Sequence, residues 1–441
     1  MRSQEEDVAE EIIEAFLRAL WAFRVELGLA LIGAALWLVT RHYNGETEAW
    51  IADAVAVTLV LAVPPIRRHV RRLLRHARVR RQWARAVRSA RIASLEDRVP
   101  TVRRLRDIPA GERFDVRVPA GSSVPELERA SEVIAAALRV RDLRVRRHLG
   151  NASLAEVVIA RRDPLAVGPP LRWPHTDLPQ PSLWEPIPVG VGENGEIVTV
   201  LLPERNLLLG GEPGAGKSVA LSMLVATAAL DPTCRLWLLD GKLVELAIWR
   251  RCASGNAGVS CAEAIEVLHS LQEEMDHRYA RLLSSGRRKV SRGDGLALHI
   301  VVIDELVHYL TASDRKERSE FAEVLRDLVS RGRAAGIIVL AATQKPSADV
   351  VPTSIRDLFG FRWAMRCSTP QASDTILGSG WASAGYSAAD VDPATRGVGY
   401  LLHEGGIPQR IRSFYLDDSD LAALSKRAEA LRAHPSMPEE A

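Results

Sequence analysis

A glycine-rich turn between an apolar strand and an apolar helix lies at residues 206–221, which read NLLLGGEPGAGKSVAL. Gly211, Gly216, Lys217 and Ser218 fit the spacing G-x-x-x-x-G-K-[ST] of a P-loop. Glycine lets the backbone fold closely around an anion, and the amides at the start of the following helix point toward it. The turn therefore predicts a nucleotide-binding site.

The same motif predicts a role for each side chain. Lys217 is expected to reach the β- and γ-phosphates of ATP, and the Ser218 hydroxyl is expected to bind Mg²⁺. ATP and Mg²⁺ are therefore the expected cofactors. The predicted cofactor-binding residues are Gly211, Glu212, Pro213, Gly214, Ala215, Gly216, Lys217, Ser218 and Val219.

A second apolar strand, Leu298–Asp304 (LHIVVID), is followed directly by Glu305. An apolar strand that ends in Asp-Glu downstream of a P-loop is the Walker B arrangement. Asp304 is expected to hold Mg²⁺ together with Ser218, and Glu305 is expected to orient or activate the attacking water as a catalytic residue beside Lys217. For a single Asp-Glu pair, the alternative is a solvated strand end.

A third strand, Ile337–Ala342, ends in Thr343-Gln344, and Gln344 is predicted to sense the γ-phosphate. Arg331 and Arg333 precede this strand and are candidate catalytic arginines for a neighbouring subunit's nucleotide; an ordinary basic helix end is the alternative. The alternation of apolar strands and helices predicts a RecA-like P-loop ATPase core, in which a doubly wound, mostly parallel α/β sheet carries the site at the carboxyl ends of its strands.

Two apolar runs, Leu20–Val39 and Trp50–Ile66, precede this core and flank a polar loop at 41–49. A helix needs about 20 apolar residues to cross a bilayer. Tryptophans lie near the ends of both runs, as in the aromatic belts of membrane helices. The runs predict a helical membrane hairpin, and a pair of buried helices in a soluble domain is the alternative.

Eleven arginines and no acidic residue lie between Arg67 and Arg91, directly after the second run. The whole chain has a net charge of only +3, so the positive charge is concentrated in this stretch. Basic residues flank the cytoplasmic ends of membrane helices, which predicts a multi-pass cell-membrane protein with its ATPase core in the cytoplasm. The stretch is expected to form a helix that contacts anionic lipid headgroups or DNA phosphates.

Smaller elements are predicted between the basic stretch and the P-loop. They are a strand at Phe114–Val118, a helix at Ser123–Leu138 that Ser122 or Ser123 caps, strands at Leu143–Arg147 and Ala155–Ala160, and a hairpin whose turn is Glu193-Asn194-Gly195. The predicted domains are an acidic amphipathic helix (1–19), a membrane hairpin (20–66), a basic juxtamembrane helix (67–100), a small α/β domain (101–165), a proline-rich linker and hairpin (166–201), the ATPase core (202–416) and a C-terminal helix or tail (417–441).

The four cysteines are widely separated in sequence and form no C-x-x-C pair. This spacing favours incidental thiols in a reducing cytosol over disulfides or a zinc site. No structural metal is predicted.

Several motifs occur together, in the order found in one family of ATPases. They are GEPGAGKS (211–218), LLDGKLVELAIW (238–249), HIVVIDEL (299–306), RGRAAGIIVLAATQKPSADVVPTSIRD (331–357), DTILG (374–378) and RGVGYLL (396–402). On these motifs the chain resembles the FtsK/SpoIIIE family of DNA-translocating ATPases. The whole arrangement looks closest to the actinomycete branch found on conjugative plasmids and integrative elements.

The resemblance implies a homo-oligomer, a hexameric ring that threads double-stranded DNA, with the membrane and other transfer proteins as further partners. By position it implies phosphate and Mg²⁺ binding for Lys217 and Ser218, Walker B roles for Asp304 and Glu305, and a sensor role for Gln344. The loops after the third strand supply Lys345 and Arg356 as candidate DNA contacts.

Three other functions remain open at this stage. Type VII secretion ATPases share the fold and thread proteins, although they usually join several ATPase modules and this chain has one intact module. Chromosome segregation by an FtsK-like translocase is weakened, because the sequence ends soon after the motor without a winged-helix module. A non-hydrolysing membrane scaffold is disfavoured by the complete set of motor residues.

Overall fold

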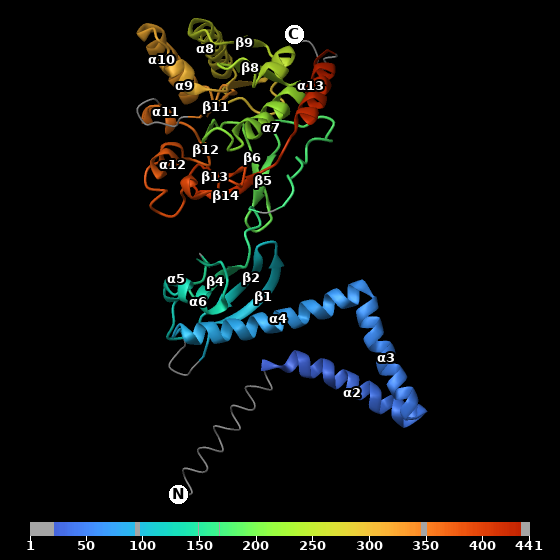
Figure 1. Cartoon of the computed structure of the whole chain (residues 1–441). Helices are drawn as coiled ribbons and strands as arrows, with labels where there is room; N and C mark the ends of the chain where they lie inside the picture. Colours follow the sequence, from blue (N-terminus) through green and yellow to red (C-terminus); the bar gives the residue numbers. More distant parts are fainter. Residues whose placement is uncertain (1–21, 93–97, 149, 167, 345–350, 434–441) are drawn as a thin grey trace. The chain divides into compact units, whose positions relative to one another are not determined.

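The computed structural model describes residues 22–92, 98–148, 150–166, 168–344 and 351–433. The chain divides into two compact units, Met1–Arg162 and Asp163–Ala441 (Figure 1). The acidic helix predicted at 1–19 and the candidate DNA contact Lys345 lie outside the described residues.

Three consecutive helices belong to the first unit: α2 (Arg24–Asn44), α3 (Glu46–Ala62) and α4 (Pro64–Ser89). Only Gly45 separates α2 from α3, so the polar loop predicted at 41–49 is helical over most of its length. Gly45 has a φ of 100°, a conformation open to glycine, and it reverses the chain within one residue. Pro64 then begins α4, and the chain bends by 90° at this point because the residue before a proline disfavours helix.

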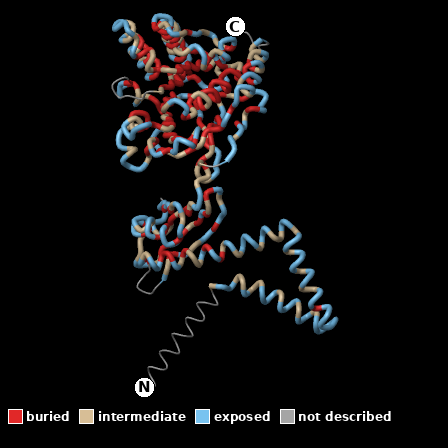
Figure 2. Tube along the Cα trace, in the orientation of Figure 1, coloured by how far each residue is buried: buried red, intermediate tan, exposed pale blue. Residues whose placement is uncertain are grey.

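Helices α2 and α3 have largely exposed apolar side chains (Figure 2). Among the described residues, α2 is the one helix that is long and apolar enough by itself to cross a membrane. Helix α3 has only 17 residues and passes the same test only together with the bent α4. The two helices touch through Trp37 and Trp50, whose ring centroids lie 5.7 Å apart. The structure therefore supports one candidate membrane helix, less than the hairpin predicted from sequence.

Helix α4 contains most of the basic stretch, although it ends at Ser89 and not at residue 100 as predicted, and it is anchored by its carboxyl-terminal half. Trp83 is buried, packs edge-on against Phe114 with ring centroids 5.2 Å apart, and donates a hydrogen bond of 3.0 Å from Nε1 to the carbonyl of Pro100. Exposed arginines lie along both halves of the helix. One end of α4 is thus part of the core of the small α/β domain.

The small α/β domain is an antiparallel sheet in the order β1-β2-β4-β3. Its elements are β1 (Thr101–Ile108), β2 (Gly111–Arg117), α5 (Val124–Arg129), α6 (Ser131–Leu138), β3 (Asp142–Arg147) and β4 (Leu154–Ala160). The sequence analysis missed β1, and the single helix predicted at Ser123–Leu138 is two helices that meet at Ala130. Ser123 caps α5 as predicted, since its side chain and that of Glu126 form a reciprocal capping box.

The second unit contains a 10-stranded sheet within the described residues, in the order β6-β5-β14-β13-β12-β7-β11-β10-β8-β9. The strands are β5 (Ile187–Gly192), β6 (Ile197–Val200), β7 (Leu207–Gly210), β8 (Cys234–Leu239), β9 (Gly255–Ala257), β10 (Leu298–Ile303), β11 (Ile337–Thr343), β12 (Phe361–Met365), β13 (Val398–His403) and β14 (Gln409–Ser413). The run from β12 to β9 is parallel, and the remaining strands pair antiparallel at one edge.

Helices cover both faces of this sheet. They are α7 (Lys217–Leu230), η1 (Ala247–Cys252), α8 (Cys261–Ser284), α9 (Leu306–Leu310), α10 (Arg315–Arg331), α11 (Thr353–Arg356), α12 (Pro370–Leu377), η2 (Ala388–Asp390) and α13 (Asp418–Ala433). Successive strand residues point to opposite faces, so in β10 Ile300 packs toward α7 and α13, whereas Val301 packs toward α8 and α10. The predicted doubly wound, mostly parallel fold is confirmed.

The proline-rich segment and the hairpin β5–β6 join this unit instead of linking it to the first. Strand β5 pairs with β14, and Trp173 is buried with its Nε1 donating 2.9 Å to the carbonyl of Pro188. At the start of the unit, Asp163 accepts a hydrogen bond of 2.8 Å from Arg410 of β14, and Leu165 is buried beside Val398 of β13. Since α13 also packs on α7, the unit extends beyond the core boundaries of 202 and 416 expected from sequence.

Candidate nucleotide site

The loop between β7 and α7 has the backbone conformation that its glycines predict. Gly214 and Gly216 adopt φ values of 76° and 108°, in the left-handed region that favours glycine. A side chain at Gly216 would also come within 3.0 Å of the backbone of Gly397, and one at Gly211 within 2.8 Å of Met365. These contacts explain why the loop needs glycine beyond its turn geometry.

Two segments distant in sequence brace this loop. The amide of Gly397 donates 2.9 Å to the carbonyl of Ala215, and the amide of Glu212 donates 2.9 Å to the carbonyl of Arg366. The Arg366 guanidinium also forms an ion pair with the Glu212 carboxylate at 2.6 Å. Sequence reasoning gave Gly397 no role, although it lies in the quoted RGVGYLL motif, and it missed Arg366, which follows β12 without a motif of its own.

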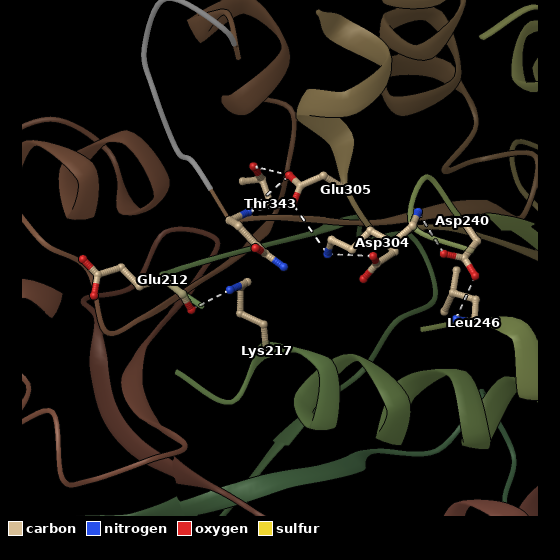
Figure 3. Close-up of polar contacts among 9 residues, drawn as sticks. Glu212, Lys217, Asp240, Leu246, Asp304, Glu305 and Thr343 are labelled. Carbon is tan, nitrogen blue, oxygen red and sulfur yellow. Dashed lines mark hydrogen bonds and ion pairs between the residues drawn. The ribbon is translucent and has the colours of Figure 1, made fainter. Parts of the chain in front are cut away.

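Lys217 lies at the start of α7 and is 7% exposed. Its Nζ donates a hydrogen bond of 2.7 Å to the carbonyl of Glu212, so the ammonium points back into the loop (Figure 3). Burial lowers the pKa of Lys217 to about 8; the charge of Lys242 acts in the same direction, while Glu305 and Asp304 oppose it. The ammonium is therefore placed to bind an anion that restores its lost solvation.

The two Walker B carboxylates follow β10. Asp304 is buried, and burial raises the pKa of its carboxyl even though Lys242, whose Nζ lies 2.9 Å from Oδ2, opposes the shift. Glu305 accepts 3.0 Å from Thr343 Oγ1, and each of its oxygens lies 3.2 Å from the backbone amide of Gln344. Figure 3 shows these groups facing Lys217 across the ends of the parallel strands.

Sequence reasoning missed two contributors to this arrangement. Thr343 fixes Glu305 through its hydroxyl and also accepts a backbone hydrogen bond of 3.3 Å from Gly211 of the P-loop. Lys242 comes from the loop after β8, in the LLDGK segment that carried only the family resemblance. Thr343 could have been found from its position at the end of a predicted strand, next to Gln344. The carboxyl ends of neighbouring parallel strands lie side by side, so a polar residue there is close to Glu305.

Asp240 organises the loop that carries Lys242. The Asp240 side chain accepts hydrogen bonds of 3.3 Å from the Lys242 amide and 3.1 Å from the Leu246 amide (Figure 3). Asp240, which follows β8 directly, thus stabilises a turn.

The two candidate catalytic arginines lie at the amino ends of the parallel strands, whereas Lys217 lies at their carboxyl ends. They precede the amino end of β11, whereas the P-loop follows the carboxyl end of β7, and the two strands are parallel. Arg331 is held by Asp327 at 2.5 Å and by Asp276 at 3.2 Å, and Arg333 lies 3.9 Å from Glu404. Neither arginine reaches the site of its own chain.

Arg356, a candidate DNA contact, is tied to its surroundings. Its Nη1 donates 2.6 Å to the carbonyl of Thr375, and its Nη2 donates 2.7 Å to Thr353 Oγ1. These bonds favour a local structural role for this side chain.

The side chains near the P-loop fit a magnesium–nucleotide complex. Ser218 and Asp304 supply hard oxygen donors, the type that Mg²⁺ prefers. Within the described residues no group of three His, Cys, Asp or Glu side chains could hold a metal alone. A P-loop site does not require one, since Mg²⁺ usually combines one or two protein ligands with phosphate oxygens and water. The four cysteines are buried free thiols.

A parallel sheet with this loop, this lysine and these carboxylates at its carboxyl edge defines a P-loop NTPase fold. Residues 179–308 match the model of the FtsK/SpoIIIE family.

Two bacterial DNA translocases are among its curated relatives. DNA translocase FtsK of Lactococcus lactis subsp. cremoris is 26% identical over 346 residues, which cover 72% of this chain and 43% of the relative. DNA translocase FtsK of Streptococcus pneumoniae is 26% identical over 298 residues, covering 63% and 38%. The chain thus spans less than half the length of these relatives.

Solved structures share the fold. The pCW3 conjugation coupling protein TcpA, in a monomer form with ATPγS, aligns with a TM-score of 0.53 at 19% identity, covering 80% of this chain and 99% of that chain. EssC (ATPases 2 and 3) of Geobacillus thermodenitrificans aligns with a TM-score of 0.50 at 17% identity, covering 62% and 53%.

Proposed function

We propose that this protein is a membrane-anchored ATPase that translocates double-stranded DNA, in conjugal transfer of a plasmid or integrative element. The observation that carries the proposal is the meeting of Lys217, Asp304 and Glu305 at one edge of an FtsK/SpoIIIE-type sheet (Figure 3). The names of the relatives support DNA as the cargo, and that of the pCW3 protein supports conjugation.

In this proposal each residue has a distinct task. Lys217 binds the β- and γ-phosphates, and Ser218 and Asp304 hold the metal, which neutralises phosphate charge when bound. Glu305, oriented by Thr343, accepts a proton from the attacking water. Gln344 bonds to Glu305 through its backbone amide, so a shift of the carboxylate during turnover reaches the segment after β11.

The protein is proposed to act as a homo-oligomeric ring, with six subunits expected from the family. Because Arg331 and Arg333 lie at the opposite edge of the sheet from their own Lys217, only a neighbouring subunit's nucleotide is open to them as partner. Arg331 would have to leave Asp327 to reach it.

The proposed membrane anchor is the hairpin of α2 and α3. Helix α2 meets the length and apolarity of a membrane span, and the contact of Trp37 with Trp50 holds α3 beside it. The exposed arginines of α4 follow directly, which supports a cytoplasmic position for the small α/β domain and for the second unit.

Two alternative functions are compatible with the same fold, which EssC shares. They are threading of a protein, as in type VII secretion, and chromosome segregation by an FtsK-like translocase.

The test is ATP turnover by the detergent-purified full chain with and without long double-stranded DNA at low salt. Lys217→Ala is the control for contaminating ATPases. We expect DNA to raise turnover in the wild type and Lys217→Ala to show none. Turnover that is indifferent to DNA would reject the translocase and bring protein secretion forward.

A further inference from the structure

Lys242 is a second lysine at the candidate site and lies at the acidic end of β10. Its Nζ lies 2.9 Å from Asp304 Oδ2 and 3.6 Å from Glu305 Oε2, so one ammonium bridges both Walker B carboxylates. The Asp304 side chain is only 4% exposed, and a buried carboxylate is costly unless a cation compensates it. Lys242 supplies that compensation in this structure.

Asp304, the carboxylate nearest to the Lys242 ammonium, is also the one assigned to the magnesium ion. A dication on Asp304 would lie within a few ångströms of the ammonium, and like charges at such a distance in a partly buried site repel strongly. Lys217 adds a second ammonium to the same site, and the charge of Lys242 contributes to lowering the pKa of Lys217. Before the nucleotide phosphates arrive, two ammonium groups and a metal dication together carry more positive charge than the two carboxylates can neutralise.

The loop that carries Lys242 depends on polar contacts to keep its tip in place. Leu243, the next residue, has a φ of 66°, which is costly for a side chain of this size. Leu243 and Val244 expose 46% and 72% of their surface, so apolar contacts do not hold the loop tip in place. The base of the loop is held by Leu246, which is buried in the core. The tip is fixed by the Lys242 ion pair and by Asp240, which accepts the Lys242 amide through its side chain and the Leu243 amide through its carbonyl.

We propose that Lys242 and Mg²⁺ compete for Asp304, so that loading of metal and nucleotide frees Lys242 and releases the loop tip at residues 242–244. This inference rests on the proposed nucleotide-binding function. Lys242 is then a positioning residue: it balances the acidic pair before the metal arrives, and its departure carries the loading state to an exposed apolar loop tip.

The first test measures metal affinity directly. Mn²⁺ replaces Mg²⁺ as a spectroscopic probe, and the detergent-purified full chain is titrated by electron paramagnetic resonance with and without ATPγS. Lys242→Met removes the charge at similar length, and we expect it to bind Mn²⁺ about tenfold more tightly than the wild type, because the competitor is gone. Lys242→Arg keeps the charge and should stay near the wild type.

Lys289→Met is the matched control. Lys289 also forms a lysine–carboxylate pair, with Glu204 at 2.6 Å, but both side chains are about half exposed and belong to no part of the site. It should leave Mn²⁺ affinity unchanged. Equal or weaker Mn²⁺ binding by Lys242→Met would overturn the competition.

The second test follows the loop by hydrogen exchange. In the wild type, Mn²⁺ with ATPγS should speed exchange of the Lys242 and Leu243 amides, which bond to Asp240, whereas in Lys242→Met these amides should exchange fast from the start. Unchanged exchange in the wild type on loading would overturn release of the loop. If the wild type fails to bind ATPγS at all, the proposed function falls, while the Mn²⁺ titration without nucleotide still decides the competition.

Discussion

The Thr343 hydroxyl donates a hydrogen bond of 3.0 Å to Glu305 Oε1 and so joins the ends of β11 and β10. The same residue accepts the Gly211 amide of the P-loop through its carbonyl. One residue thus connects the phosphate-binding loop to the carboxylate assigned to the attacking water.

Thr343→Val is expected to lower ATP turnover by about tenfold to a hundredfold. A hydrogen bond to a charged group contributes about 1.5–3 kcal/mol, and Glu305 would lose the bond that orients it. ATPγS affinity should stay near the wild-type value, because the backbone bond to Gly211 remains. Steady-state turnover and ATPγS titration check the two expectations. Thr311→Val, which removes a hydroxyl bonded only to its own helix, is the control.

Glu305→Gln is expected to abolish turnover while the nucleotide still binds. Loss of a general base costs about a hundredfold to ten-thousandfold in rate, and glutamine retains the shape of the side chain. The check is a parallel measurement of ATP hydrolysis and ATPγS binding on one preparation. Turnover above a tenth of the wild-type rate would remove Glu305 from the proton-transfer role.

The buried ammonium of Lys217 predicts a pH-dependent stability. Burial lowers its pKa from 10.5 to about 8, so between these values the unfolded chain holds the proton more tightly than the folded chain. The free energy of unfolding therefore rises with pH across this window through this group, and the cost of burying the charge is fully present below pH 8.

Lys217→Met lacks this group, so its stability advantage over the wild type should be greatest at pH 7 and shrink toward pH 10. Urea unfolding of Asp163–Ala441, followed by tryptophan fluorescence at intervals of one pH unit, measures the difference. A difference that stays constant with pH would contradict a buried, charged Lys217.

Trp83→Ala is expected to destabilise the small α/β domain by about 3–5 kcal/mol, because a large buried side chain leaves a cavity and the Pro100 carbonyl loses its donor. Urea unfolding of a soluble fragment covering residues 64–162 measures this effect. Arg85→Ala, on an exposed face of the same helix, should change the free energy of unfolding by less than about 0.5 kcal/mol. Equal effects of the two variants would show that α4 does not contribute to this core.

The centre of the fold was predictable because local pattern and tertiary role agree there. Strands β7, β10 and β11 are apolar and fully buried in a parallel sheet, so each reads as a short continuous apolar run that ends at a polar site residue. The glycine spacing then fixed the position of the phosphate-binding loop between β7 and α7.

The missed elements lack such a local pattern. Strand β1 reads TVRRLRDI and is mostly exposed, so its arginines hide the alternation that a half-buried strand normally shows. Lys242 and Arg366 matter only through partners on other strands, and a single sequence carries no record of those contacts. The break at Ala130 interrupts an otherwise continuous amphipathic pattern, and no helix-breaking residue marks it.

The way in which the second unit begins has a mechanical consequence. Asp163 is clamped to Arg410, and Leu165 is buried against Val398, the residue after the glycine that bonds to the phosphate-binding loop. Tension on the chain between the two units is therefore transmitted to the second unit next to the candidate nucleotide site. In the proposed translocase, a load on the DNA would therefore reach the nucleotide site through two neighbouring residues, Gly397 and Val398.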